Sequence, residues 1–352
     1  MLSSFPNRQI DWPLRRICTV LLSMSAVCIC PGVHAQNTPF FSGGVGFFTD
    51  TNGGNTKYSP SIAPVFTAPI GQHLLIESRA TAIEVFFPKG DGQGYGHFHF
   101  VGPAFAQADY VVNSHITAVG GYFLTPFGTY NERLTPFWIS PLADSPLIYG
   151  IGTMGSGSGL GGMLRGSAIS TPHFSMNYAA YLSSGSTNFR FGSSRSTGGQ
   201  LNAYFPNAQL EIGASYGRLL ETTQTNSIGT HVWWTPTSIP LKIRSEYAHG
   251  PHSQGYWVES DYRLSQFNGE NSLIGRLEPI FRIQQTFRNS PSSSDGLPSV
   301  DAQRVDFGLD YHLPHEVRIN TSYARSFAST GDVNIWETAL IYRFLFPAWR
   351  GK

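Results

Sequence analysis

Apolar and polar residues alternate along much of the chain, in short segments that follow one another from Phe40 onward. In Gln303–Leu313 every second residue is apolar, and charged residues lie between them, among them Asp306 and Asp310. Three further segments alternate in the same way, namely Leu241–Tyr247, Leu273–Arg288 and Trp336–Phe346. Successive side chains of a strand point to opposite faces, so the pattern predicts β-strands with one apolar face and one charged face.

About sixteen strand-like segments can be counted, and no helix of consequence is expected. They are Phe40–Phe48, Tyr58–Thr67, Leu74–Phe87, His97–Val112, His115–Phe127, Leu160–Ser170, Phe174–Ser184, Gln200–Phe205, Leu210–Leu219, Ile228–Thr235, Leu241–His249, Gln254–Phe267, Leu273–Arg288, Val300–Leu313, Glu316–Phe327 and Ile335–Phe346. Short connections alternate with longer polar ones, which is typical of outer-membrane barrels. We therefore predict an all-β fold, a transmembrane antiparallel β-barrel. An even number of strands would leave the N- and C-termini on the same side, the periplasmic one.

Two details favour a membrane barrel over a soluble β-sandwich. The polar faces carry charges of both signs in mid-strand, as the wall of a water-filled lumen would. Aromatic residues gather near strand ends, as at Phe86–Phe87, Trp233–Trp234 and Tyr256–Trp257, where girdles meet the membrane interfaces. A charge facing lipid at midplane would cost roughly 2–4 kcal/mol, so the charged faces are expected to point inward. A soluble exported β-protein is the alternative.

The composition agrees with a surface that meets something other than water. Charged residues make up 13% of the chain and aromatic residues 14%, and there are 38 glycines. The formal net charge is +1, so the chain has no basic footprint for nucleic acid. No nucleic-acid partner is expected.

The first 35 residues have the features of a secretory signal peptide. Arg8, Arg15 and Arg16 form a positive n-region, and the apolar run Ile17–Cys30 is too short to span a bilayer comfortably. Cleavage is expected between Ala35 and Gln36, which leaves residues 36–352 as the barrel. All three cysteines precede this point, so the mature chain would contain no disulfide.

The segment Thr129–Gly159 is too long for an ordinary connection and is not strand-like. Its aromatic and apolar residues argue against disorder, which favours sequence poor in such residues. Counted from the first strand, it is the third outer loop, and we expect it to fold inward and narrow the pore. Glu132, Arg133 and Asp144 are its candidate constriction charges.

The alternation also assigns charged residues to the lumen wall. The candidate pore-lining residues are Lys242, Arg244, Glu246, Arg276, Glu278, Arg282, Arg304, Asp306 and Asp310. The loop charges are expected to face the four arginines of this set. Charges of both signs across a constriction would produce a transverse field that favours small polar solutes.

The run Gly120–Arg133, GGYFLTPFGTYNER, resembles bacterial outer-membrane porins of the phosphate-selective type and related uncharacterised outer-membrane β-barrels. In these a strand of the form G-x-F/L-x-x-P-F-G runs into the third loop. The resemblance is local, about 20 residues, and implies a homotrimeric sixteen-stranded channel in the outer membrane of a Gram-negative-type bacterium. Two departures stand out. The wall charges are mixed rather than densely basic, and residues 347–352 follow the terminal aromatic residue, Phe346.

No catalytic arrangement is recognisable. His97 and His99 alternate on one strand and could bind a metal, but rim or lumen positions explain them as well. Glu259 and Asp261 are the support for an outer-membrane enzyme, and pairing with neighbouring arginines is the favoured explanation for them. We therefore expect a porin that passes small hydrophilic solutes or ions, with no enzyme activity, metal or cofactor. Outer-membrane lipid and lipopolysaccharide are the expected surroundings, and an outer-membrane enzyme or adhesin is the alternative.

Overall fold

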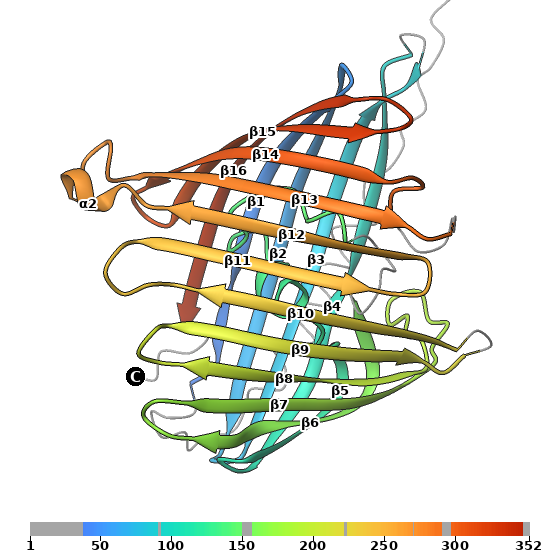
Figure 1. The fold of residues 1–352 in the computed structure, drawn as a ribbon, viewed down its shortest axis with the longest axis vertical. Helices are drawn as coiled ribbons and strands as arrows, with labels where there is room; N and C mark the ends of the chain where they lie inside the picture. The colour runs from blue at the N-terminus through green and yellow to red at the C-terminus, as the bar shows by residue number, and fades with distance from the viewer. Residues whose placement is uncertain are drawn as a thin grey trace, which may run out of the picture.

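The computed structural model describes residues 38–90, 93–149, 157–221, 224–269, 271–290 and 297–347. Within these residues, sixteen antiparallel strands form one closed barrel, in which β1 pairs with β16 (Figure 1). The predicted all-β barrel and its strand number are confirmed. The signal peptide and its cleavage site at Ala35 and Gln36 lie outside the described residues. In the part of the chain described, no helix is both long and apolar enough to cross a membrane.

The strands follow one another around the barrel in chain order. They are β1 (Phe40–Asn52), β2 (Asn55–Ile70), β3 (Leu74–Pro88), β4 (Tyr95–Asn113), β5 (Ile116–Leu124), β6 (Ser158–Ser170), β7 (Ser175–Ser184), β8 (Ser196–Phe205), β9 (Leu210–Leu219), β10 (Thr225–Trp234), β11 (Leu241–His249), β12 (Ser253–Tyr262), β13 (Leu277–Arg288), β14 (Ala302–Leu313), β15 (Val317–Ala328) and β16 (Val333–Pro347).

The barrel has its polar side inside and its apolar side outside. On β13 the inward residues Glu278, Arg282 and Gln284 are buried, whereas Phe281 and Ile283 between them are exposed. The exposed outward residues of the other strands include Val45, Phe47, Ile62, Val101, Leu164, Leu182, Leu201, Ile212, Phe307, Leu309 and Leu340. Water-soluble proteins rarely expose so extended an apolar surface. The soluble alternative is therefore not supported. This exposed apolar surface, which we call the apolar belt, suits a lipid environment.

One expected strand starts later than the alternation indicated. The segment between β12 and β13 contains the short helix α2 (Ser265–Asn268) and a turn closed by the Arg276 N–H, which donates to Ser272 O at 3.2 Å. Arg276 therefore directly precedes β13, and its backbone oxygen still accepts from the His312 N–H of β14 at 2.9 Å, so its place on the pore wall stays a prediction. The alternation of apolar and polar residues continues back to Leu273, but hydrogen bonds within the turn shape this segment instead of strand pairing.

The connection between β5 and β6 runs inside the barrel. It contains one turn of π-helix, η4 (Tyr130–Leu134), and its residues up to Tyr149 are described. In Figure 1 it lies behind β10–β13, within the barrel outline. We call residues 125–149 the inner loop.

Candidate functional site: the lumen and its inner loop

The start of the inner loop is fixed by a buried glutamate of the opposite wall. Glu246 on β11 is 0% exposed and accepts hydrogen bonds from the Thr129 N–H (3.1 Å) and the Tyr130 N–H (3.3 Å). The Tyr149 hydroxyl donates to the same carboxylate. Gly128 has a φ of +63°, and a Cβ there would overlap the Glu246 carboxylate. This close approach of backbone and carboxylate requires glycine.

An aromatic core seals the contact between loop and wall. It consists of Phe127, Tyr130, Leu134, Ile148 and Tyr149 from the loop, with Ala248 and Trp257 from β11 and β12. The rings of Tyr130 and Tyr149 lie 4.7 Å apart, and Trp257 meets Tyr130 edge-on at 6.3 Å. Burial raises the pKa of the Tyr130 and Tyr149 hydroxyls, so both stay neutral.

The second half of the inner loop is held by charged and amide groups of β13–β15. Arg318 donates to Phe137 O (3.0 Å) and Ser140 O (2.7 Å). Asn320 donates to Pro141 O at 2.7 Å. These side chains satisfy the hydrogen-bonding capacity of loop carbonyls that no regular secondary structure pairs.

Asp144 lies at the centre of this attachment. Its carboxylate pairs with Arg304, and its backbone oxygen accepts from both terminal nitrogens of Arg282 at 3.1 Å. Three residues later, the Leu147 N–H donates to Gln284 at 2.6 Å. The sequence predicts Asp144 as a constriction charge, and in the structure this residue attaches the inner loop to the barrel wall.

The wall charges beneath the loop form a continuous network. Arg282 lies 3.6 Å from Glu259 and 3.5 Å from Asp306, and Arg304 lies 2.6 Å from Asp306. Arg244 continues the network to Glu259 at 3.3 Å and to Asp261. Arg318 and Asp310 form a separate pair at 3.0 Å on the neighbouring wall.

These wall residues point inward, and the inner loop contacts several of them directly, among them Glu246, Arg282 and Arg304. The buried members are between 0% and 6% exposed, and they are Arg244, Glu246, Glu278, Arg282, Arg304, Asp306 and Asp310. Of the loop charges predicted to face wall arginines, Asp144 does so in direct contact with Arg304 and Arg282, whereas Arg133 pairs with Glu211 of β9. Lys242 differs, since its side chain is 44% exposed and lies 3.1 Å from Asp261 and 3.2 Å from Glu278.

The opposite face of the inner loop carries the charges that remain accessible. The Arg133 side chain is 42% exposed and pairs with Glu211 of β9 at 2.9 Å. Its guanidinium also lies 5.6 Å from the Trp233 ring, whose own contact with Arg244 is 5.3 Å. Burial raises the pKa of the neighbouring Glu132 carboxyl, and the positive charges of Arg165 and Arg133 oppose the rise.

The wall facing Glu132 contributes charges that the sequence did not single out. Arg165 on β6 is 38% exposed and pairs with Asp109 of β4, which also accepts from Gln107 at 2.8 Å. A second contact joins loop and wall nearby, where Arg79 of β3 donates to Thr135 at 2.9 Å. Arg165 was missed because β6 is rich in glycine, so its alternation is weak. The signal was the parity with Met163, which also points inward.

His97, one of the two histidines predicted as possible metal ligands, lies apart from this region. His97 approaches Glu84 at 3.6 Å near a strand end, and its side chain is 69% exposed. A position at the rim describes it.

No family model matches the chain, and no curated protein matches it. Solved structures do. An anion-selective porin from Comamonas acidovorans shares 11% identity and a TM-score of 0.54, over 87% of this chain and 98% of the porin. OmpF of Salmonella typhi shares 12% identity and a TM-score of 0.58, over 89% and 99%. OprB of Pseudomonas putida shares 9% identity and a TM-score of 0.55, over 97% and 100%. The chain has the fold of these barrels.

Proposed function

We propose that the protein is an outer-membrane porin, through which small hydrophilic solutes or ions diffuse passively. The observation that carries the proposal is a closed barrel with an apolar exterior, a charged interior and a long loop folded onto the inner wall. A closed barrel satisfies its backbone within a membrane, and charged groups line a wet lumen. The fold shared with three porins supports the same function.

The proposed path runs between the accessible face of the inner loop and the β3–β9 wall. Two contacts bound it, Arg79 with Thr135 on one side and Arg133 with Glu211 on the other. The charges proposed for the constriction are Asp109, Glu132, Arg133, Arg165 and Glu211. Three acids and two bases give no excess of positive charge, so a phosphate-selective pore is not favoured. Weak ion selectivity is expected, with a local field that acts on polar solutes.

Ion selectivity tests the role of these residues. Arg165→Gln removes a positive charge and should shift the reversal potential in a KCl gradient toward cations. Glu132→Gln should shift it toward anions. Charges about 6 Å apart in water interact by about 0.7 kcal/mol, so each permeability ratio should change by about threefold. Arg325→Gln, in a half-exposed pair with Asp332 outside this path, is the control and should change nothing. Equal selectivity in all four proteins would exclude this path.

The export, the location in the outer membrane and the oligomeric state belong to the same proposal. Residues 1–35 would direct export, both termini would face the periplasm, and outer-membrane lipid and lipopolysaccharide would surround the apolar belt. A homotrimer is the assembly that the resemblance implies. Light scattering of the purified protein with detergent mass subtracted should give three chains per particle, and a single chain would contradict the trimer.

We infer that the described residues do not favour the enzyme alternative. Glu259 and Asp261 are buried and paired with Arg244, and Asp261 also with Lys242. Carboxylates held in this way are positioned for structure rather than for attack on a substrate.

A further inference from the structure

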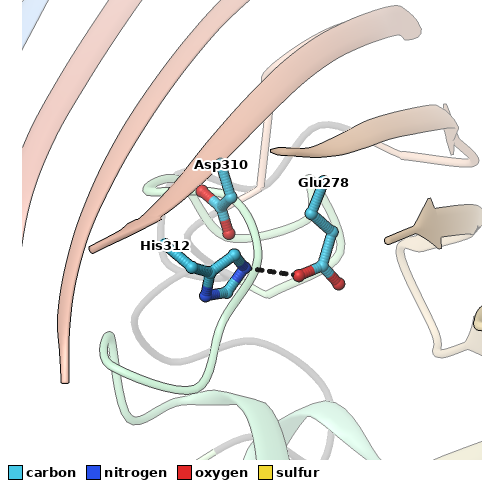
Figure 2. A group of neighbouring side chains, drawn as sticks. All are labelled: Glu278, Asp310 and His312. Atoms are coloured by element: carbon cyan, nitrogen blue, oxygen red, sulfur yellow. Dashed lines mark hydrogen bonds and ion pairs between the residues drawn. The ribbon is translucent and has the colours of Figure 1, made fainter. Parts of the chain in front are cut away.

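A cluster of metal-ligand side chains lies at one end of the lumen, outside the proposed constriction. Glu278 on β13 is the cross-strand partner of Asp310 on β14, and His312 follows two residues later on the same inward face. One ligand atom from each residue lies within 4.8 Å of the other two. His312 Nε2 lies 2.6 Å from Glu278 Oε2, and Figure 2 shows the three side chains converging.

Other residues hold the two carboxylates in place. Lys242 binds the second oxygen of Glu278 at 3.2 Å, which leaves Oε2 toward His312. Arg318 and Asn320 bind the two oxygens of Asp310 at 3.0 and 2.6 Å. Such outer contacts orient ligands in metal sites. Asn320 is 1% exposed, and its own amide oxygen has no hydrogen-bond partner among the described residues, so a buried acceptor beside Asp310 is left over.

The cluster is open to a cavity. A space of ≈ 410 Å³ is lined by Glu278, Asp310 and His312, and also by Trp138 of the inner loop and by His315. An ion could enter here, and water could complete its coordination. Like charges directly opposite on neighbouring strands repel, and a divalent cation between Glu278 and Asp310 would remove that repulsion.

The donor types select the ion. One imidazole nitrogen and two carboxylate oxygens suit Zn²⁺, whereas Mg²⁺ and Ca²⁺ prefer oxygen ligands only. Ligands about 2.1 Å from one ion lie at most about 4.2 Å apart, so small side-chain rotations bring these three atoms to binding distance. We propose that Glu278, Asp310 and His312 bind one divalent ion of the zinc type. The proposal does not depend on the channel function.

Zinc titration tests the site directly. Folded full-length protein in detergent, stripped with a chelator, is titrated with ZnCl₂ by calorimetry. We expect one saturable Zn²⁺ per chain and no comparable binding of MgCl₂. His312→Asn and Glu278→Gln each remove a ligand and should weaken Zn²⁺ binding at least about tenfold. The loss of a residue that only orients a ligand already weakens metal binding by about that factor. Heat-modifiable mobility on gels establishes that each variant is folded. If either variant does not fold, Asp310→Asn is tested in its place.

His315→Asn is the matched control. His315 lines the same cavity but is not part of the cluster, so its loss should leave the affinity unchanged. Three results would overturn the proposal: no saturable Zn²⁺ binding by the unaltered protein, unchanged affinity in the folded ligand variants, or equal weakening in His315→Asn.

Discussion

Glu246 shows how far a single residue can be interpreted from sequence. Alternation with Arg244 and Ala248 places it on the charged inward face, and the structure has it there. Its partners are not predictable in this way, because the three donors lie between 97 and 117 residues away in the chain. The sequence therefore indicated a pore-lining charge, whereas its contacts make it the acceptor that attaches the inner loop.

Glu246→Ala should loosen this attachment. Three buried donors would lose their acceptor, and each such loss costs about 1–3 kcal/mol. We expect a lower urea midpoint of unfolding and a noisier single-channel current. Asp332→Asn, which alters an exposed ion pair with Arg325, should stay within about 0.5 kcal/mol of the original protein. Equal stability and an equally quiet current in both variants would show that Glu246 does not anchor the loop.

Glu132 should give the proposed constriction a pH dependence. Burial raises its pKa above the ordinary 4.5, so its charge begins to disappear at a higher pH than that of an exposed glutamate. Because the folded state disfavours the charged form of Glu132, the contribution of Glu132 to the free energy of unfolding is present below pH 4.5. This contribution is lost as the pH rises through the raised pKa. Permeability should shift toward anions as the pH falls from 7 toward 4.5.

Glu132→Gln isolates the contribution of Glu132 to this pH dependence. The variant should show a smaller shift of reversal potential over the same pH range. Superimposable pH profiles for the two proteins would exclude Glu132 as the titrating group.

At the scale of elements, the quality of the prediction follows local composition. The β13–β14 pair was recognised because its inward residues are charged and its outward ones apolar. Glycine-rich β6 gave no such contrast, and Arg165 was overlooked. The start of β13 was misplaced because local hydrogen bonds around Ser272 form a turn. The inner loop was recognised by its length and its aromatic residues, but the wall it packs against depends on long-range contacts that alternation does not encode.

Replacing residues 134–149 with a short Gly-Ser linker should widen the lumen. The linker lacks the aromatic core and the carbonyls that Arg318 and Asn320 hold, so the buried wall charges would meet water. Single-channel conductance should increase. A matched shortening of the β7–β8 connection, residues 186–193, should leave conductance nearly unchanged. An increase of equal size in both deletions would contradict a specific role of the inner loop.

The whole molecule follows one rule, with apolar side chains outside and charged side chains inside a closed sheet. This rule operates through residue type at alternate positions, which explains why sixteen strands could be counted from the sequence. It also explains how the chain shares a fold with porins at 9–12% identity. Many different sequences can satisfy this rule, because it depends on the polarity of each side chain and not on its identity.

Conductance across a planar bilayer is the most direct measurement of the central claim. The purified, heat-modifiable barrel is added to one side of the membrane in KCl. We expect stepwise ohmic current increments with weak ion selectivity, because the proposed path beside the inner loop would be filled with water. A folded barrel that inserts without producing current steps would contradict a porin.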